Sequence, residues 1–405
     1  MKTAVMYGAG NIGRGFIGTL FSASGYETVF VDVSAPVVEA LNRDGEYPVR
    51  ILSEDSFEDR IIRNVRAVDG TDPSAVAEAI AEADMMATAV GVNVLPKIVP
   101  CIVEGLRLRQ KINPKPLNIL ICENLMDADK VLEGLIKSHL SPEESSWFDA
   151  SVGLVETSIG RMVPLQTEEM KDGNPLRVCV ERYDFLPVNK AAFKGEIPQI
   201  HNMIPFEPFD FYVKRKLYVH NMSHALCAYL GDLLGLEFIY QSIDRDEVYR
   251  LVRGAMEESI LALSRKYSVP LGDLSVHVED LLYRFTNKAL KDTCKRVGND
   301  AKRKLSPADR LVGALNLAWE QGVNPVYLSV GVAAALFRYF AENGVENPSR
   351  EDAVSVLRDH CKLSPDFKPM QMILDYYEKL VSDKDLPSIR RAVDAEKAAL
   401  RGAIV

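Results

Sequence analysis

Short apolar runs alternate with amphipathic stretches along the first half of the chain. Apolar runs of strand length occupy residues 3–7, 27–31, 85–90, 117–122 and 151–155. Between them, patterns with the 3.6-residue period of helices cover residues 34–45, 93–109 and 127–138, and a further helix is expected to begin at Asp72 and Pro73. Strands and helices that alternate in this way predict a parallel sheet covered on both faces. The runs 47–52 and 59–67 are a candidate hairpin.

The pattern changes after about residue 200. Helical periods cover residues 246–267, 307–321 and 324–343, and strand patterns become rare. Three prolines interrupt regular structure between residues 197 and 210. The sequence therefore predicts an α/β domain over residues 1–200 with a doubly wound, mostly parallel sheet, followed by a mainly α-helical substrate and catalytic domain over residues 201–405.

A glycine-rich turn joins the first expected strand to the first expected helix. Gly8 permits the tight turn, Gly10 lets the backbone approach a pyrophosphate, and Gly13 allows close helix packing. Asp32 ends the second strand nineteen residues after Gly13, where a carboxylate accepts hydrogen bonds from an adenosine ribose and repels a 2′-phosphate. Glycines also serve ordinary turns, but here strand, glycines, helix, second strand and acid occur in order. These features predict a Rossmann-like domain that prefers NAD to NADP.

Two further positions, Val90 and Arg14, extend this prediction. The segment 88–91 consists of small residues that are expected to lie beneath the cofactor, so Val90 is a further candidate cofactor-binding residue. The candidate cofactor-binding residues are Gly8, Gly10, Asn11, Ile12, Gly13, Asp32 and Val90. Arg14 is interpreted either as a phosphate contact from the first helical turn or as an exposed helix arginine.

The composition limits the partners that we expect. At 405 residues, the chain is too long to fold around a single hydrophobic core. Its formal charge of −9 at pH 7 means that it lacks the basic field of a general nucleic-acid binder. The longest apolar run, residues 326–337, is too short for a membrane span, and the early glycine turn leaves no room for a signal peptide. Six cysteines without a CxxC pair predict reduced, mostly buried thiols. We therefore expect a cytoplasmic protein, either monomeric or dimeric, that binds neither nucleic acid nor membrane.

A polar pair follows the expected strand over residues 117–122. Glu123 and Asn124 lie at the carboxyl edge of the sheet, where ligands of doubly wound folds bind. The Asn124 amide is expected to donate a hydrogen bond to a substrate oxygen. Alternatively, both residues are simple loop or capping residues.

The second half contains a polar cluster with Lys216, Asn221 and His224. On an α-helix at about 100° per residue, His224 lies about 80° and Asn221 about 140° around from Lys216, so the three share one broad arc. Burial beside Lys214 and Arg215 is expected to lower the pKa of Lys216 from its ordinary value of about 10.4, which suits a general base acting on an alcohol. Asn221 is then expected to stabilise the developing alkoxide.

A zinc site is an alternative for this segment. His220 and His224 have the i, i+4 spacing of a helical zinc pair, but position 221 is asparagine where such motifs have glutamate, and no third ligand is nearby. We therefore expect no metal. A purely structural segment, with solvated basic residues and hydrogen-bonded histidines, is the remaining alternative.

Together these motifs resemble those of the polyol-specific long-chain dehydrogenases. The resemblance rests on the glycine segment 8–18, on Cys122-Glu123-Asn124, on Lys216-x4-Asn221-x2-His224 and on the basic segment 296–310. It implies a zinc-independent, NAD-linked oxidation of mannitol 1-phosphate to fructose 6-phosphate and the reverse reduction. It also implies that Lys216 is the catalytic lysine. Asn221 and Asn124 would stabilise the oxyanion, and His224 would contact the substrate.

The basic segment bears on the substrate. Eight Lys or Arg residues and three Asp residues lie between Lys288 and Arg310, a local excess of five positive charges. Such a segment either binds a sugar phosphate through charge-assisted hydrogen bonds or is a solvated charged face. The candidate substrate-binding residues are Arg296, Lys302, Arg303 and Lys304.

Three positions depart from the family pattern, and they concern substrate recognition. Gly160 stands where aspartate is usual, so an acidic contact is either missing or supplied by Glu156. Lys288 replaces a usual proline, and Asn299 replaces a usual arginine.

We expect an NAD-dependent oxidoreductase in which NAD and a polyol phosphate meet between the two domains. A hexuronate reductase of the same family, which would bind a carboxylate with the same basic segment, is the closest alternative. A non-catalytic NAD(H)-binding sensor is the alternative from another class. The set of Lys216, Asn221 and His224 argues against the sensor, because a sensor needs neither a base nor an oxyanion donor.

Overall fold

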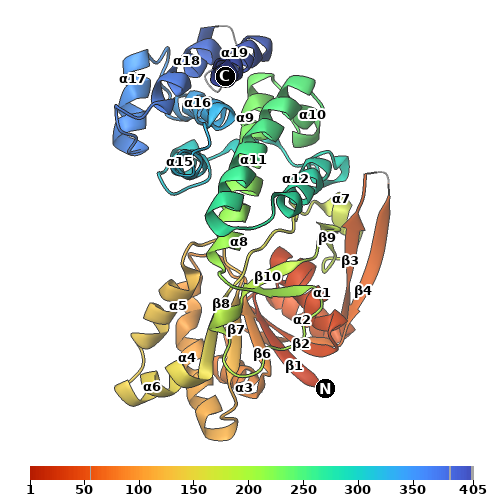
Figure 1. The fold of residues 1–405 in the computed structure, drawn as a ribbon. Helices are drawn as coiled ribbons and strands as arrows, with labels where there is room; N and C mark the ends of the chain where they lie inside the picture. Colours follow the sequence, from red (N-terminus) through yellow and green to blue (C-terminus); the bar gives the residue numbers. More distant parts are fainter. Residues whose placement is uncertain (55, 383–384, 403–405) are drawn as a thin grey trace. The chain divides into compact units, whose positions relative to one another are not determined.

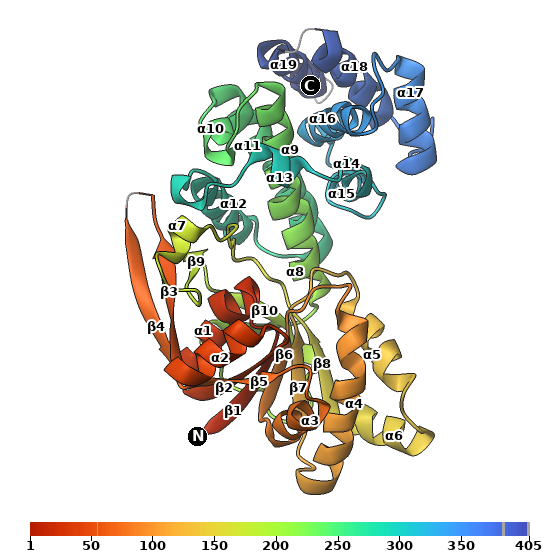
Figure 2. The same cartoon turned by 180° about the vertical axis from the view of Figure 1, so that it is seen from behind.

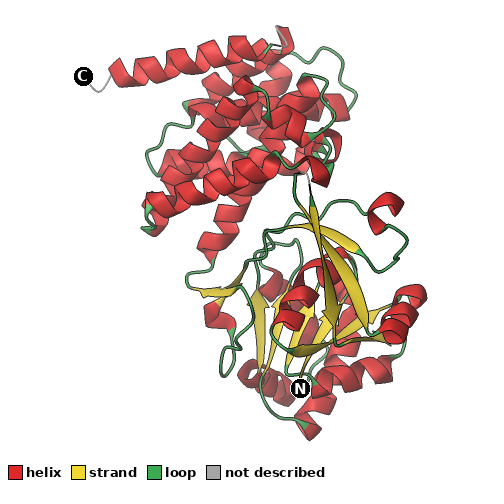
Figure 3. Cartoon of the chain, turned by 90° about the vertical axis from the view of Figure 1, so that its right-hand side faces the viewer, coloured by secondary structure: helices red, strands yellow, loops and turns green. Residues whose placement is uncertain are grey.

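The computed structural model describes residues 1–54, 56–382 and 385–402, and the chain divides into two compact units (Figures 1 and 2). The first unit is Met1–Asp210, and the second begins at Phe211. Figure 3 shows strands in the first unit, whereas the second unit is built from helices. The division falls at the end of the proline-interrupted stretch 197–210, so the first unit extends past residue 200.

Six parallel strands form the main sheet of the first unit. Their order is β5-β2-β1-β6-β7-β8, and every neighbouring pair is parallel. The strands are β1 (Lys2–Tyr7), β2 (Tyr26–Asp32), β5 (Val65–Asp69), β6 (Met85–Thr88), β7 (Leu117–Ile121) and β8 (Val152–Glu156). The order reverses between β1 and β6, and ligands of doubly wound sheets bind outside the carboxyl ends of the strands at such a reversal. The predicted parallel sheet is confirmed.

The alternation of side chains along β1 supplies both faces of the sheet. Ala4 and Met6 belong to a core shared with η1 (Gly13–Ile17), α1 (Gly18–Ala23) and α2 (Ala35–Asp44). Val5 and Tyr7 belong to a second core, which includes residues of α3 (Pro73–Glu82), α4 (Leu95–Ile112), α5 (Ala128–Lys137) and α6 (Pro142–Ser151). Because both faces are covered, the strands are continuous apolar runs rather than alternating ones.

Local capping chemistry determines where the first helices begin and end. α2 begins after Ser34 and ends at Gly45, which has a left-handed φ of 64°. α3 begins at Pro73 after Asp72, whose carboxylate accepts hydrogen bonds from two backbone N–H groups of the first turn. Proline is tolerated in a first helical turn because its missing N–H would have no partner there. The predicted helix starts are confirmed.

The predicted hairpin is confirmed only in part. β3 (Glu46–Leu52) pairs antiparallel with β4 (Phe57–Arg63). Asn64 then adopts a left-handed φ of 58°, and the following residues form β5 in the main sheet. The apolar run 59–67 therefore serves two sheets.

Several short elements follow β8 where the sequence pattern predicts none. They are α7 (Glu168–Lys171), β9 (Val178–Glu181), β10 (Leu186–Asn189), η2 (Lys190–Ala192) and β11 (Met203–Phe206). β9 joins β3 and β4 in a three-stranded sheet, and β10 pairs with β11. Strands of four residues are too short to produce a clear period in the sequence.

The second unit is a helical assembly. The predicted helix over residues 246–267 is α11 (Asp246–Tyr267), and those over 307–321 and 324–343 are the shorter α15 (Val312–Glu320) and α16 (Val326–Glu342). The other helical elements are α8 (Asp210–Arg215), η3 (Lys216–Asn221), α9 (Met222–Leu233), α10 (Ile239–Ile243), α12 (Leu271–Phe285), η4 (Lys288–Leu290), α13 (Cys294–Gly298), α14 (Ala301–Lys304), α17 (Arg350–Ser355), η5 (Val356–His360), α18 (Pro369–Ser382) and α19 (Leu386–Gly402). α9 and α16 are buried over most of their length.

The cysteines and the apolar helices have ordinary places in this fold. All six cysteines are free thiols, and all except Cys101 are buried, as predicted. Among the described helices, none combines the length and the apolar character that crossing a membrane requires.

Candidate cofactor and catalytic sites

The glycine loop follows β1 at the reversal of the strand order. Gly8 has a left-handed φ of 103°, and a Cβ atom there would lie 2.5 Å from the carbonyl oxygen of Ala89. A Cβ atom on Gly13 would overlap the carbonyl oxygen of Gly8. Gly10 differs, because a Cβ atom there would meet no atom within 4 Å. Two glycines therefore shape the loop, and the third leaves open space beside the backbone.

Asp32 connects the end of β2 to the glycine loop. Its Oδ2 accepts a hydrogen bond from the Ala9 N–H at 2.7 Å, and its Oδ1 accepts one from the Ser34 N–H at 2.9 Å. The carboxylate therefore holds the loop in place while it keeps further lone pairs for a ligand. Of the other loop residues, Asn11 is exposed and Ile12 packs against the core.

Glu123 holds the segment that follows β6. Its carboxylate accepts hydrogen bonds from the N–H groups of Val90 at 2.9 Å and Gly91 at 2.8 Å, and the side chain is buried. The neighbouring Asn124 is exposed. The sequence indicates only a loop or capping role for Glu123, whereas the structure makes it a positioning residue for the predicted cofactor residue Val90. One feature of the sequence could have indicated this contact: Val90 follows β6 and Glu123 follows β7, and these two strands are adjacent and parallel.

Arg14 is buried, so its interpretation as an exposed helix arginine is wrong. Its Nη1 donates a hydrogen bond to the Leu176 carbonyl oxygen at 3.0 Å, and its own carbonyl oxygen accepts one from the Tyr47 hydroxyl at 2.8 Å. Burial lowers the pKa of the guanidinium group. The neighbouring Gly15 admits β9, because a Cβ atom there would lie 2.7 Å from Cγ1 of Val178. Arg14 therefore holds the segment that leads into β9, and a contact with a phosphate stays a prediction.

Gly160, the first departure from the family pattern, has a steric reason. A Cβ atom there would lie 2.9 Å from Cε1 of Tyr183, so the tyrosine ring fills the space of a side chain. Glu156, the replacement acid considered above, accepts a hydrogen bond from the Ala128 N–H at 3.1 Å at the start of α5. Burial and the charge of Asp129 raise the pKa of Glu156 to about 7. Glu156 therefore caps a helix, and a contact with substrate stays a prediction.

The segment that carries Lys216 and Asn221 is a π-helical turn between α8 and α9. Such a turn has i→i+5 hydrogen bonds and is wider than an α-helical turn. The angular positions predicted for a regular α-helix are therefore wrong in detail. His224 lies in the first turn of α9. π-Helical turns occur frequently at functional sites, and apolar periodicity gives no sign of them.

Lys216 is partly buried, and this burial together with the positive charge of Arg310 lowers its pKa to about 8. The direction agrees with the prediction, but the responsible cation is Arg310 rather than Lys214 or Arg215. Within the part of the chain that the structure describes, neither the Lys216 amine nor the Asn221 amide has a hydrogen-bonded partner. A low pKa and a partner-free amine are the properties that a general base needs.

The two histidines pack against each other and against an aromatic ring. The ring centroids of His220 and His224 are 6.0 Å apart, and His224 stacks on Phe285 at 5.0 Å. Burial lowers the pKa of His220 well below its ordinary value. Over the described ranges, no group of three or more His, Cys, Asp or Glu side chains is arranged to hold a metal ion.

Asp292 joins two predicted site residues that the sequence treats separately. Its Oδ2 lies 3.3 Å from Nε2 of His224, and its Oδ1 accepts a hydrogen bond from Nη2 of Arg296 at 2.6 Å. Burial acts to raise the pKa of Asp292, but His224 and Arg296 together hold it below its ordinary value. The motifs in the sequence do not indicate Asp292 as a site residue; only its i, i+4 spacing to Arg296 predicts the ion pair with that arginine.

The basic segment uses many of its charges internally. Arg303 forms ion pairs with Asp300 and Asp309. Lys304 is buried and donates hydrogen bonds to two backbone carbonyl groups. Lys302 is exposed, and no described residue forms an ion pair with its amine. Of the four predicted phosphate-binding residues, Lys302 therefore has the most available charge.

The two other departures from the family pattern lie in the basic segment. Asn299 contributes one of the carbonyl groups that Lys304 binds. Lys288 begins η4 after Asn287, whose side chain accepts a hydrogen bond from the Ala289 N–H at 3.1 Å. The contact of Asn299 with Lys304 does not require the Asn299 side chain.

A Rossmann-type unit with a glycine loop, followed by a helical unit with a low-pKa lysine, defines a two-domain dehydrogenase. The mannitol dehydrogenase Rossmann domain matches residues 2–202, and the mannitol dehydrogenase C-terminal domain matches residues 209–384. The chain therefore belongs to the mannitol dehydrogenase family, and the resemblance recognised in its sequence is confirmed.

Relatives and solved structures agree with this assignment. The mannitol-1-phosphate 5-dehydrogenase of Brevibacillus brevis is 39% identical over 333 residues, which are 82% of this chain and 85% of the relative. That of Bacillus pumilus is 35% identical over 377 residues, 92% of this chain and 98% of the relative. A substrate-free D-sorbitol dehydrogenase aligns with a TM-score of 0.82 at 14% identity, over 97% of this chain and 95% of that one. A ternary complex of Pseudomonas fluorescens mannitol 2-dehydrogenase with NAD and D-mannitol aligns with a TM-score of 0.74 at 15% identity. The alignment covers 98% of this chain and 94% of that one. The structures share the fold, which confirms the predicted fold class.

Proposed function

We propose that this protein oxidises mannitol 1-phosphate to fructose 6-phosphate with NAD and catalyses the reverse reduction. Relatives that are 35–39% identical and named mannitol-1-phosphate 5-dehydrogenases support the substrate. The structural observation that carries the proposal is the Lys216 amine, because its pKa is about 8 and no described residue binds it.

The proposed NAD-binding residues belong to the first unit. They are Gly8, Gly10, Asn11, Ile12, Gly13, Asp32 and Val90, which follow or end the adjacent strands β1, β2 and β6. The open space beside Gly10 fits a phosphate, and the remaining lone pairs of Asp32 fit a ribose hydroxyl. When bound, NAD supplies the acceptor for the hydride that leaves the alcohol carbon.

Lys216 is the proposed general base for oxidation. In its neutral form it takes the proton of the substrate hydroxyl group, and in the reverse reduction the ammonium form returns that proton. Asn221 and Asn124 are proposed to donate amide N–H groups to the alkoxide oxygen. His224, next to the carboxylate of Asp292, is proposed to contact a substrate hydroxyl group. No metal takes part in this scheme.

The phosphate is proposed to bind the basic segment through Arg296, Lys302, Arg303 and Lys304. Lys302 contributes a charge without an internal partner, whereas Arg303 shares its charge with two aspartates. Lys304 holds the loop through its two backbone contacts. A hexuronate would offer this segment a carboxylate in place of a phosphate, but the names of the relatives do not favour that substrate.

The test is NADH oxidation with fructose 6-phosphate, fructose, fructuronate and tagaturonate under the same conditions. We expect fructose 6-phosphate to give the highest kcat/KM, and NADPH to be a poor replacement for NADH. A higher kcat/KM with a hexuronate would reassign the substrate while the Lys216 chemistry stands. Absence of NADH oxidation with all four compounds would contradict the proposed function.

A further inference from the structure

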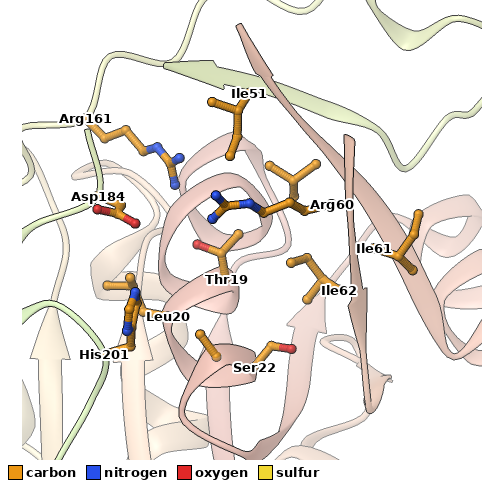
Figure 4. Close-up of a pocket in the computed structure, with 12 residues that line it drawn as sticks. Thr19, Leu20, Ser22, Ile51, Arg60, Ile61, Ile62, Arg161, Asp184 and His201 are labelled. Carbon is orange, nitrogen blue, oxygen red and sulfur yellow. The ribbon is translucent and has the colours of Figure 1, made fainter. Parts of the chain in front are cut away.

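The first unit contains a cavity that none of the proposed roles uses. It has a volume of about 370 Å³ and lies between α1, β3 and β4, with contributions from residues 161, 184 and 201 (Figure 4). Sites for small molecules typically have volumes of about 300–1,000 Å³. We call it the arginine cavity after the two arginines described next.

Two guanidinium groups reach into the arginine cavity from different segments. Figure 4 shows those of Arg60, on β4, and Arg161 directed toward the same space near Thr19. Arg161 is only 6% exposed, and it donates hydrogen bonds through Nε to the Glu181 carbonyl oxygen and through Nη1 to the Gly15 carbonyl oxygen. Among the residues that the structure describes, none accepts a hydrogen bond from its Nη2. A buried charged group with an unused donor is unfavourable unless a ligand or water accepts the bond.

The charges around the arginine cavity favour an anion. Arg60 uses its Nε for Glu58 at 2.7 Å, which leaves its terminal amino groups for the cavity. Asp184 supplies a carboxylate to the wall, and that carboxylate already accepts a hydrogen bond from Asn202 at 2.8 Å. Burial lowers the pKa of Arg161 to about 10, the nearby charges of Asp184 and Glu181 act to raise it, and the charge of Arg60 acts to lower it. Arginine side chains are charged at pH 7, so among the side chains that line the cavity two positive charges face the carboxylate of Asp184.

The other walls of the arginine cavity are largely aliphatic, including side chains of Leu20, Val49, Ile51 and Ile62. We propose that the cavity binds a small organic anion, with a carboxylate between Arg60 and Arg161 and a short aliphatic body against these side chains. Guanidinium groups present paired N–H donors that match the two oxygens of a carboxylate. The aliphatic body adds a favourable contribution because it removes apolar wall surface from water. A small inorganic anion lacks this second contribution.

Butanoate is a suitable probe, and its binding to the whole protein is measured by ligand-observed NMR and by calorimetry. We expect a dissociation constant of about 1 mM, which is ordinary for so small a ligand. Butan-1-ol, which has the same chain without the charge, and sulfate, which has charge without the chain, should each bind at least about tenfold more weakly. Butan-1-ol or sulfate binding as well as butanoate would overturn the proposal, as would no butanoate binding up to about 50 mM.

Variants of β4 identify where the probe binds. Arg60→Gln should weaken butanoate at least about tenfold, because it removes a charged donor, and Arg60→Lys should weaken it less because the charge stays. Arg63→Gln is the matched control, since Arg63 is on the same strand, pairs with Glu46 and does not line the cavity. Arg60 is half-exposed, so its replacement is compatible with folding. Equal butanoate affinity in Arg60→Gln and the unmodified protein would refute the site.

The cofactor provides an independent test of the same proposal. Saturating NADH should change the affinity for butanoate by less than about twofold relative to the NADH-free protein. The reason is that the arginine cavity and the proposed NAD residues share no side chain. Loss of butanoate binding on addition of NADH would assign the signal to the dinucleotide site and overturn the proposal. This binding measurement does not depend on the substrate, so a failure of the proposed mannitol 1-phosphate activity would leave its outcome unchanged.

Discussion

The glycine loop and the Lys216 turn use their polar side chains in opposite ways. Around the loop, Asp32 and Glu123 each accept two hydrogen bonds from the backbone segments that they hold. In the π-helical turn, the Lys216 amine and the Asn221 amide have no such partner within the described ranges. One region uses side chains to fix the backbone, and the other keeps its side chains available.

This difference matches two kinds of chemistry. A pyrophosphate can be bound by backbone N–H groups at the start of a helix, so the side chains nearby are needed mainly to shape that backbone. Proton transfer requires a side chain whose lone pair is not already engaged. Substitutions in the two regions should therefore be distinguishable, because those in the loop should change cofactor affinity and those in the turn should change kcat.

The largest expected effect is that of Lys216→Ala on turnover. Loss of a general base lowers rates by about 10²–10⁴-fold, and NADH binding should change little because no proposed NAD residue is touched. Steady-state kinetics and fluorescence titration of NADH measure the two quantities. A variant that keeps more than about a tenth of the kcat would show that Lys216 is not the base.

The pH dependence of the two reactions distinguishes a base role of Lys216 from a structural role, because a structural role would not produce an inflection at its pKa. Since its pKa is about 8, the neutral form becomes more abundant as the pH rises through 8. Polyol oxidation should therefore increase over this range, whereas ketose reduction, which needs the ammonium form, should decrease. In Lys216→Ala both profiles should lose this inflection, and an inflection that persists would assign it to another group.

Glu123→Gln should have the next largest effect, on cofactor affinity. An amide oxygen can replace one carboxylate oxygen but not both, so one of the bonds to Val90 and Gly91 is lost. Charge-assisted hydrogen bonds contribute about 1.5–3 kcal/mol, which corresponds to roughly a tenfold or larger rise in the Kd of NADH. Glu82→Gln, at the exposed end of α3, is the control and should leave the Kd unchanged. A variant with lower kcat and normal Kd would contradict the positioning role of Glu123.

The elements that could be predicted are those whose determinants are close in sequence. The glycine turn and α11 are examples, because a motif or a long helical period specifies each of them. The sequence predicts a single strand over residues 59–67, because an apolar pattern does not reveal that Asn64 turns the chain. The burial of Arg14 cannot be predicted from its neighbours in sequence, because it depends on a segment near β9, more than 160 residues later.

The candidate site shows the same limit. The neighbours of Lys216 in sequence predict its role, yet the cation that helps to lower its pKa is Arg310. Asp292 contacts His224 from a different segment, and only folding brings the two together. Residue types at a site can thus be predicted from a motif, whereas the long-range partners that set their charge and orientation cannot.

Asp32→Asn should have a moderate effect on the choice of cofactor. The amide oxygen can still accept one backbone hydrogen bond of the loop, while the charge that would repel a 2′-phosphate is gone. We expect the preference for NAD over NADP to narrow by about tenfold, measured as the ratio of the two kcat/KM values. Glu39→Gln, which removes a negative charge from the exposed face of α2, is the control for overall charge. Equal use of NAD and NADP by the unmodified enzyme would contradict the role of Asp32.

The smallest expected effect is that of Lys302→Ala on the substrate. Lys302 is exposed, and an exposed ion pair contributes only about 0–1 kcal/mol, so the KM for fructose 6-phosphate should rise by up to about fivefold while kcat and NADH affinity stay constant. Salt should reduce the difference between the variant and the unmodified enzyme, because it screens exposed charges. Lys295→Ala, another exposed lysine of the same segment, is the matched control. If both variants raise the KM equally, the segment acts through its overall field rather than through a phosphate contact at Lys302. If the KM for unphosphorylated fructose rises as much as that for fructose 6-phosphate, the phosphate is not what Lys302 binds.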